Sequence, residues 1–163
     1  NSQTVAVQTG NGGYQPSYDP STISNWRKDI VGLWHFDESS GTSLQDSSVK
    51  GETAILTNGT FASGHFGGGI SFDGSGYIQI PNDPFRADQP TKGYSTAAWI
   101  KFRRLTNSAI IWERLFNNYE VDLTSSGYLQ CFAAGVDYYV GNPYSVQNLN
   151  GTWIHVGCVY DPS

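Results

Sequence analysis

Two acidic residues in the segment "NYEVDLTSSG" are the first candidates for chemistry. Glu120 and Asp122 are two positions apart, so in a strand their side chains would lie on the same face. Retaining glycoside hydrolysis uses two carboxyl groups about 5 Å apart, one as nucleophile and one as acid and base. The pair raises carbohydrate hydrolysis as a hypothesis, and the alternative is that both side chains lie on a solvated strand face.

Three aspartates in turn-like sequences are candidate calcium ligands. Asp37 occurs in "WHFDES", Asp46 in "LQDSS" and Asp73 in "SFDGSG". Calcium takes six to eight oxygen ligands, which loops of carboxylates, amides and carbonyls supply. Asp in a turn also hydrogen-bonds its own backbone. For Asp73 we expect the role of turn former first, calcium ligand second and catalyst third.

Aromatic and polar residues near the end of the chain could bind a sugar. Pyranose rings stack on aromatic faces, while a few convergent polar groups fix their orientation. The segment "VDYYVGNPYS" and a neighbouring "WER" supply both kinds of side chain. The candidate ligand-binding residues are Trp112, Asp137, Tyr138, Tyr139, Asn142 and Tyr144. The alternative is that about half of these tyrosines belong to the core.

The two cysteines each alternate with apolar neighbours. Cys131 shares a strand face with Leu129 and Ala133, and Cys158 shares one with Val156 and Tyr160, so both should point inward. We expect a disulfide between them, with two buried thiols as the alternative. Two Asn-x-Thr sequons, at Asn58 and Asn150, are candidate glycosylation sites. Asn-Gly also favours hairpin turns, and the turn is the preferred interpretation.

The composition predicts an all-β domain. The chain has 163 residues, about the size of one domain, with 19 glycines and only 14% charged residues, which favours short strands and many turns. The net charge of −5 argues against nucleic acid as a partner. No apolar run approaches the roughly 20 residues that span a bilayer. The absence of methionine suggests a chain cut from a longer product, with any signal or anchor outside it.

Residues 1–28 differ in composition from the rest and are predicted to be a tail or linker. They are rich in Gly, Ser, Pro, Asn and Gln. Residues 29–163 alternate between short apolar strands and turn sequences, which predicts a two-sheet antiparallel β-sandwich of jelly-roll type. Within them, "YEVDLTSSGYLQCF" predicts a hairpin with one buried face and a turn at "TSSG".

An ordered set of motifs resembles a known family. These are "VGLWHFDESSGTSLQDSS", "TNGTF", "GHFGGGISFDGSGYIQIP", "YSTAAWIKF", "YEVDLTSSGYLQCF" and "NGTWIHVGCVYD". Their order and spacing from Val31 to Asp161 are similar to the laminin-G-like jelly-roll domains of the concanavalin A-like lectin and glucanase superfamily. The resemblance implies further C-terminal strands after Asp161. Three explanations are a truncated or cleaved chain, a shortened variant, and a subunit completed by a neighbour's strand.

The resemblance also bears on the candidate sites. Glucanases of the superfamily have a further glutamate along the face of Glu120 and Asp122, where this chain has Thr124 and Ser126. The departure predicts a domain that is not an enzyme. Relatives hold calcium through loop oxygens, and Asn117 and Asn118 resemble the position of an Asp-Asn calcium pair in pentraxins. Here an amide replaces the first carboxylate, which would weaken binding.

These observations predict a non-catalytic recognition module, secreted or at the cell surface. It would bind a glycan or an extracellular protein in a lectin-like or adhesive role, with calcium as a candidate cofactor. The first alternative is a structural subunit of a surface filament or pilus, which would self-associate or need a second chain to complete the fold. The second alternative is a glycoside hydrolase. Fold alone does not select among them.

Overall fold

The computed structural model describes residues 29–81, 93–103, 109–114, 119–133, 136–139 and 149–161. Contacts divide the chain into two compact units that meet in sequence at Lys92 and Gly93. The prediction of one domain over residues 29–163 stays a prediction. The predicted tail, residues 1–28, lies outside the described residues. No helix in the described part of the chain is long and apolar enough to cross a membrane.

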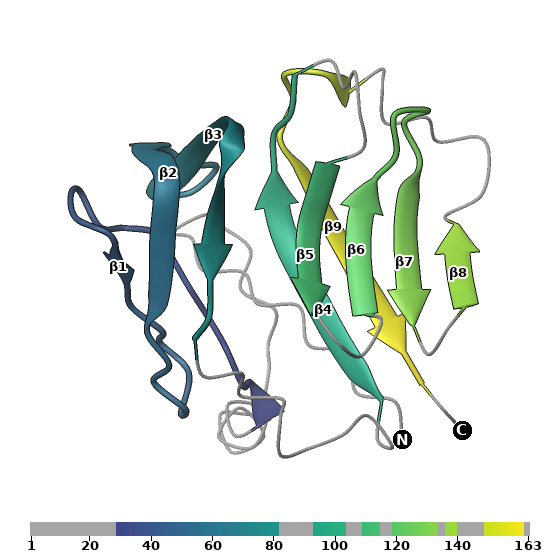
Figure 1. The fold of residues 1–163 in the computed structure, drawn as a ribbon, viewed down its shortest axis with the longest axis horizontal. Helices are drawn as coiled ribbons and strands as arrows, with labels where there is room; N and C mark the ends of the chain where they lie inside the picture. The colour runs from purple at the N-terminus through teal and green to yellow at the C-terminus, as the bar shows by residue number, and fades with distance from the viewer. Residues whose placement is uncertain are drawn as a thin grey trace, which may run out of the picture. The chain divides into compact units, whose positions relative to one another are not determined.

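The unit with residues 29–81 is a three-stranded antiparallel sheet (Figure 1). Its strands, in the order β1-β2-β3, are β1 (Ser43–Leu44), β2 (Ala54–Ser63) and β3 (Gly68–Gln79). Strand β1 lies within "DESSGTSLQDSS", a segment whose Gly and Ser content is typical of a break between strands. Leu44, Ala54 and Leu56 form the buried core, because alternate positions of β1 and β2 face inward. Residues 30–36, whose apolar sequence "IVGLWHF" favours a strand, form only a single bridge, from Trp34 to Asp46.

We expected the segment "DGSG" to form a turn that reverses the chain. Instead it forms a bulge inside β3. Thr57 pairs with Tyr77, and Gly59 pairs with Phe72, so residues 73–76 oppose Asn58 alone. Both halves of β3 therefore pair with the same strand, β2. Asn58 has a φ of 51°, a left-handed conformation that asparagine tolerates better than most residues. The Asn-Gly hairpin turn predicted at Asn58 is wrong, because β2 continues through Asn58 and the bulge lies opposite it in β3.

The unit with residues 93–161 contains two antiparallel sheets (Figure 1). Strands β4 (Tyr94–Ile100) and β9 (Ile154–Tyr160) form one sheet. The other has the order β5-β6-β7-β8, with β5 (Ala109–Arg114), β6 (Tyr119–Leu123), β7 (Leu129–Ala133) and β8 (Val136–Tyr139). The fold class is all-β with antiparallel sheets, as predicted from the turn-rich composition.

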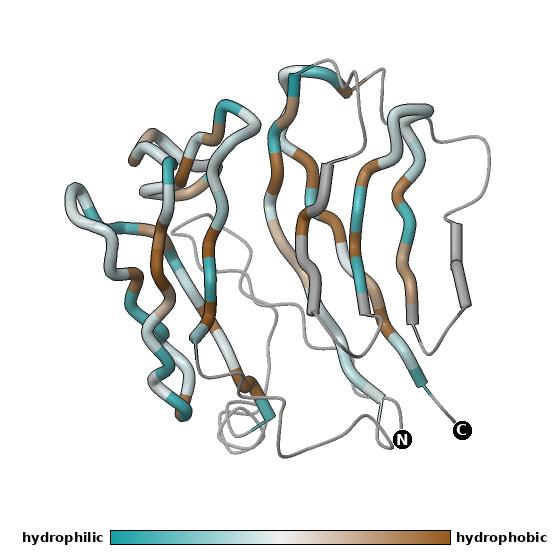
Figure 2. Tube along the Cα trace, in the orientation of Figure 1, coloured by the Kyte–Doolittle hydropathy of each residue, from teal (hydrophilic) through white to brown (hydrophobic). Residues whose placement is uncertain are grey.

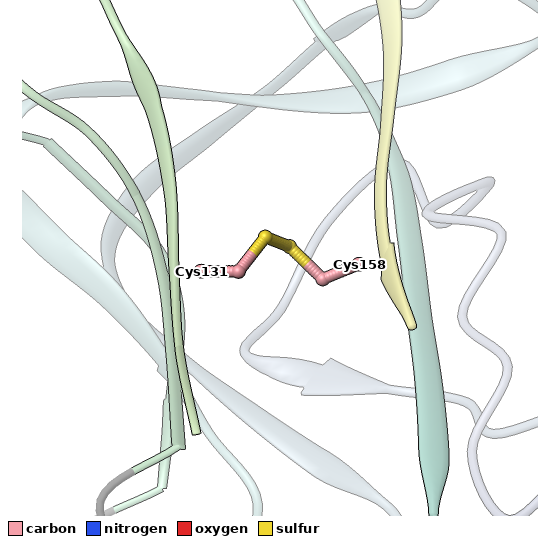
Figure 3. Close-up of a disulfide and its surroundings, with 2 residues drawn as sticks. All are labelled: Cys131 and Cys158. Carbon is pink, nitrogen blue, oxygen red and sulfur yellow. A yellow bond between two sulfur atoms is a disulfide. The ribbon is translucent and has the colours of Figure 1, made fainter. Parts of the chain in front are cut away.

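The core of this unit lies between residues of both sheets. Val121 and Leu123 of β6 are buried, and so are Val156 and Cys158 of β9. Buried and exposed positions alternate along β9, the period expected for a strand with one buried face, whereas hydropathy does not alternate along β4 (Figure 2). The predicted disulfide between Cys131 and Cys158 is present and joins β7 to β9 (Figure 3). Its Cα atoms are 6.2 Å apart, within the range that a disulfide spans.

The predicted hairpin between β6 and β7 is confirmed. The Thr124 N–H donates to the carbonyl oxygen of Tyr128 at 2.9 Å, and the Gly127 N–H donates to the carbonyl oxygen of Thr124 at 2.8 Å. Gly127 has a φ of 82°, which glycine adopts without strain. Leu123 pairs with Leu129 directly beyond the turn. The turn thereby fixes the register that brings the apolar positions of both strands to one face.

Gly67 and the first two residues of β3, Gly68 and Gly69, are consecutive glycines, and another segment lies against the backbone there. Gly67 has a φ of 62°, and its successor Gly68 donates its N–H to Asp37 Oδ1 at 2.9 Å. A methyl group at Gly68 would overlap the carbonyl oxygen of Phe36. The segment at Phe36 and Asp37 is therefore held against the start of β3 by a close approach of two backbones.

We expect Gly68→Ala to destabilise the unit by about 2 kcal/mol, the range for overpacking. The obstacle is a backbone atom that cannot swing aside, and Gly68 does not have a positive φ. Urea denaturation followed by tryptophan fluorescence measures the change. The control is Gly41→Ala, where φ is 87° and no atom lies near the added methyl, so only backbone strain of about 1 kcal/mol is expected. Equal losses at both positions would contradict the contact.

Candidate functional site

The acidic pair singled out in the sequence lies on the face of the four-stranded sheet that is opposite the disulfide. Val121 pairs with Cys131, and both belong to the disulfide side, so Glu120 and Asp122 belong to the other face. On that face Glu120 pairs with Phe132, and Asp122 pairs with Gln130. Two carboxylates, one amide and one aromatic ring thus share neighbouring positions on two strands.

This face is less solvated than we expected. Asp122 is only 8% exposed, and Glu120, Gln130 and Phe132 are half-buried. The prediction that Glu120 and Asp122 lie on a solvated strand face is wrong for Asp122. β6 is an interior strand of the sheet, with β5 and β7 paired on its two sides, so Asp122 lies in the middle of the sheet and not at its edge.

The register of β5 places Glu113, from the "WER" segment, beside the acidic pair, which its spacing in the sequence did not reveal. Glu113 pairs with Glu120, and directly paired positions have Cβ atoms about 4.5–5.5 Å apart on one face. Asp137 pairs with Phe132, and Tyr139 pairs with Gln130, so two predicted ligand residues occupy positions on the same face. We call the set Glu113, Glu120, Asp122, Gln130, Phe132, Asp137 and Tyr139 the acidic face.

Two other predicted ligand residues take positions on the opposite, disulfide side of the sheet. Trp112 pairs with Val121, and Tyr138 pairs with Cys131. The alternative that about half of the tyrosines belong to the core stays a prediction. The side chains of Trp112, Glu113, Asp137, Tyr138 and Tyr139 lie outside what the structure describes, so only their register positions are used. Asn142 and Tyr144 lie outside the described residues altogether.

Asp46 holds its own loop through four hydrogen bonds. Its Oδ1 accepts the N–H groups of Leu33 at 2.8 Å and Ser48 at 2.7 Å. Its Oδ2 accepts the hydroxyl of Ser48 at 2.7 Å and the N–H of Glu52 at 2.9 Å. Burial raises the pKa of Asp46, but the hydrogen bonds from Ser48, Leu33 and Glu52 together lower it below its ordinary value.

Asp73 forms a local turn, which is the role we expected first. Its Oδ1 accepts the N–H of Ser75 at 2.9 Å and the hydroxyl of Ser75 at 2.7 Å, the pattern of an Asx turn. These two hydrogen bonds lower the pKa of Asp73. Gly74 between them has a φ of 102°. The side chain therefore shapes the bulge in β3, and the bulge is exposed.

The predicted calcium ligands do not come together in the structure. Asp37 accepts from Gly68, Asp46 from its own loop and Asp73 from Ser75, so each carboxylate serves a different backbone segment. Within the described ranges, no group of three or more His, Cys, Asp or Glu side chains could hold one metal ion. Asn117 and Asn118 lie outside the described residues.

The two sequons lie in different local structures. Asn58 is an exposed residue of β2 and lies opposite the bulge of β3. Asn150 is exposed in the turn before β9, where the Gly151 N–H donates to the carbonyl oxygen of Phe102 at 2.8 Å. The turn interpretation is confirmed at Asn150. Glycosylation at either position stays a prediction.

Comparison with known proteins identifies the family of this fold. A laminin G family model, described as concanavalin A-like lectin/glucanases superfamily, matches residues 72–163, more than half of the chain. The match begins within β3 and includes the hairpin, the acidic face and both cysteines. The searches of curated proteins and of solved structures gave no match. The chain belongs to the concanavalin A-like lectin and glucanase superfamily.

Proposed function

We propose that the chain is a non-catalytic recognition module that binds carbohydrate at its acidic face. The observation that carries the proposal is the register of β5 to β8, which gathers carboxylate, amide and aromatic residues on one side of the sheet. Carboxylates and amides accept and donate hydrogen bonds to sugar hydroxyls, and an aromatic ring offers a stacking surface. The superfamily includes lectins, which supports this use of the fold.

Two further features support a place outside the cell. The disulfide between Cys131 and Cys158 is typical of oxidising compartments, and both sequons are exposed. We propose a secreted or cell-surface location on these grounds. A role in adhesion, with an extracellular protein as partner, belongs to the same proposal. Calcium dependence is tested by repeating the binding measurement with calcium and then with a chelator.

Glycoside hydrolysis is the second candidate, because the pairing of β5 with β6 places a further glutamate beside Glu120. Glu113 stands opposite Glu120, and retaining hydrolysis needs two carboxyl groups about 5–5.5 Å apart. Against it, Thr124 occupies the next position along the strand, where its Oγ1 accepts the N–H of Tyr128 at 3.0 Å. That residue closes the hairpin, and the chain lacks the further glutamate of the glucanases there.

The test compares binding and hydrolysis in matched variants. On an array of glycans and matrix proteins, we expect Glu120→Gln to weaken glycan binding about tenfold. Glu52→Gln, the same change at a half-buried residue of the other unit, should leave binding unchanged. Soluble β-glucan should release no reducing ends with the unmodified chain. Failure to bind any glycan or matrix protein would overturn the proposal, and hydrolysis that disappears in Glu120→Gln would establish the second candidate.

A further inference from the structure

The outer face of the two-stranded sheet gathers tryptophan and basic side chains. Strands β4 and β9 pair from Tyr94 and Tyr160 to Ile100 and Ile154. Since Val156 and Cys158 are buried in the core, the alternate positions belong to the outer face. That face carries the directly paired Trp99 and His155. Lys101 follows β4 and Trp153 precedes β9, and these two residues contact each other just beyond the paired region.

The four residues contact one another in two pairs. The rings of Trp99 and His155, which are directly paired, have centroids 5.1 Å apart. The Nζ atom of Lys101 lies 5.0 Å from the centre of the Trp153 ring, a cation–π distance. Both tryptophans are half-buried, while Lys101 and His155 are exposed. We call these four residues and the exposed Arg103 the basic aromatic face.

The charge of this face contrasts with that of the chain. The chain has a net charge of −5, yet neither residues 93–103 nor residues 149–160 contain an Asp or Glu. The first acidic residue after β9 is Asp161, six positions beyond His155 and therefore about 20 Å away along an extended chain. An anion would meet favourable charge here, while the rest of the acidic chain would offer it little general attraction.

We propose that the basic aromatic face binds an acidic saccharide, a sugar that carries a carboxylate or sulfate group. The apolar side of a pyranose ring would stack on an indole, and the anionic group would accept hydrogen bonds from Lys101 and Arg103. Trp99 in β4 and Trp153 just before β9 are diagonal neighbours, about 7–8 Å apart, which suits contact with consecutive sugar units. The inference rests on the proposed carbohydrate recognition and adds a second contact surface with its own ligand class.

The test uses one saccharide in two charge states. Binding of hexagalacturonate and of its fully methyl-esterified form is measured by isothermal titration calorimetry with the whole chain. We expect the acid to bind and the ester to bind at least tenfold more weakly. In proton–nitrogen correlation spectra, two of the five tryptophan indole N–H signals should shift with the acid. Trp99→Phe and Trp153→Phe variants assign these signals.

Lys101→Gln should weaken binding of the acid about fivefold, the effect of one exposed charge contact. Lys50→Gln removes an equally exposed lysine of the other unit and should change nothing. Equal affinity for acid and ester, or equal loss in both lysine variants, would overturn the inference. If the acid binds but only Glu120→Gln weakens it, the acidic face is the site, and the proposed function survives without this inference. If the chain binds no ligand on the array, both the proposed function and this inference are wrong.

Discussion

Replacing both Cys131 and Cys158 with alanine is expected to lower the free energy of unfolding by about 3.5 kcal/mol. The disulfide closes a segment with a sequence separation of 27, and the loop-closure model assigns about that loss to a loop of this length. The effect is large because β7 and β9 belong to different sheets. Guanidinium denaturation followed by tryptophan fluorescence measures it.

Reduction provides the control for this prediction. Dithiothreitol should destabilise the unmodified chain by about the same amount and leave the double alanine variant unchanged. Alanine is the suitable replacement, because Cys158 is only 6% exposed and a polar group there would add a separate cost of burial. A midpoint that stays constant after both treatments would show that the packing of the sheets holds them together without the disulfide.

The strands of the second unit could be predicted because their signals are local. Apolar and polar residues alternate in "YEVDL", "YLQCF" and "WIHVGCVY", and the hairpin glycine Gly127 marks the turn between the first two. Period-two alternation also placed Cys131 and Cys158 inward. The pairing of the two cysteines followed from both facing one interior, which is why the disulfide was expected.

The bulge in β3 could not be predicted from its own residues. Asp73 and Gly74 satisfy a local turn, and a turn sequence is equally compatible with a chain reversal and with a bulge in a continuous strand. The partner strand decides between them, because β2 pairs with both halves of β3 around Asn58. Such pairing depends on residues distant in sequence.

The acidic face was only partly predictable for the same reason. The spacing of Glu120 and Asp122 placed them together, but Glu113 joins them through the register of β5, which contains a shift between Ile110 and Trp112. A shift of one residue moves every later side chain to the other face. The position of Trp112 opposite Val121 therefore depends on the register shift between Ile110 and Trp112. The alternation of residues within β5 alone could not predict it.

Asp46→Ala is the second change with a large expected effect, a loss of about 3 kcal/mol. One carboxylate joins the backbone at Leu33 to the loop at Ser48 and Glu52, and hydrogen bonds to charged groups are worth about 1.5–3 kcal/mol each. Partial exposure reduces the sum, because water can replace some of the lost partners. Thermal denaturation at pH 7 measures the loss. The stability of Asp46→Asn should lie between that of the unmodified chain and that of Asp46→Ala. The control, Asp73→Asn, changes an exposed carboxylate whose partners all come from Ser75 and should have little effect.

The pH dependence of the same variants tests whether the charge of Asp46 is responsible. The folded protein lowers the pKa of Asp46 below the ordinary value of 3.8, so the unfolded chain takes up the proton first as the pH falls. The stability that the charge contributes is complete above pH 3.8 and is lost as the pH falls through the lower pKa of the folded state. The difference in stability between the unmodified chain and Asp46→Asn should therefore be constant from pH 5 to 7 and shrink from about pH 4 downward. A difference that stays constant down to pH 2 would assign the effect to shape and hydrogen-bond geometry, because protonation would then cost nothing.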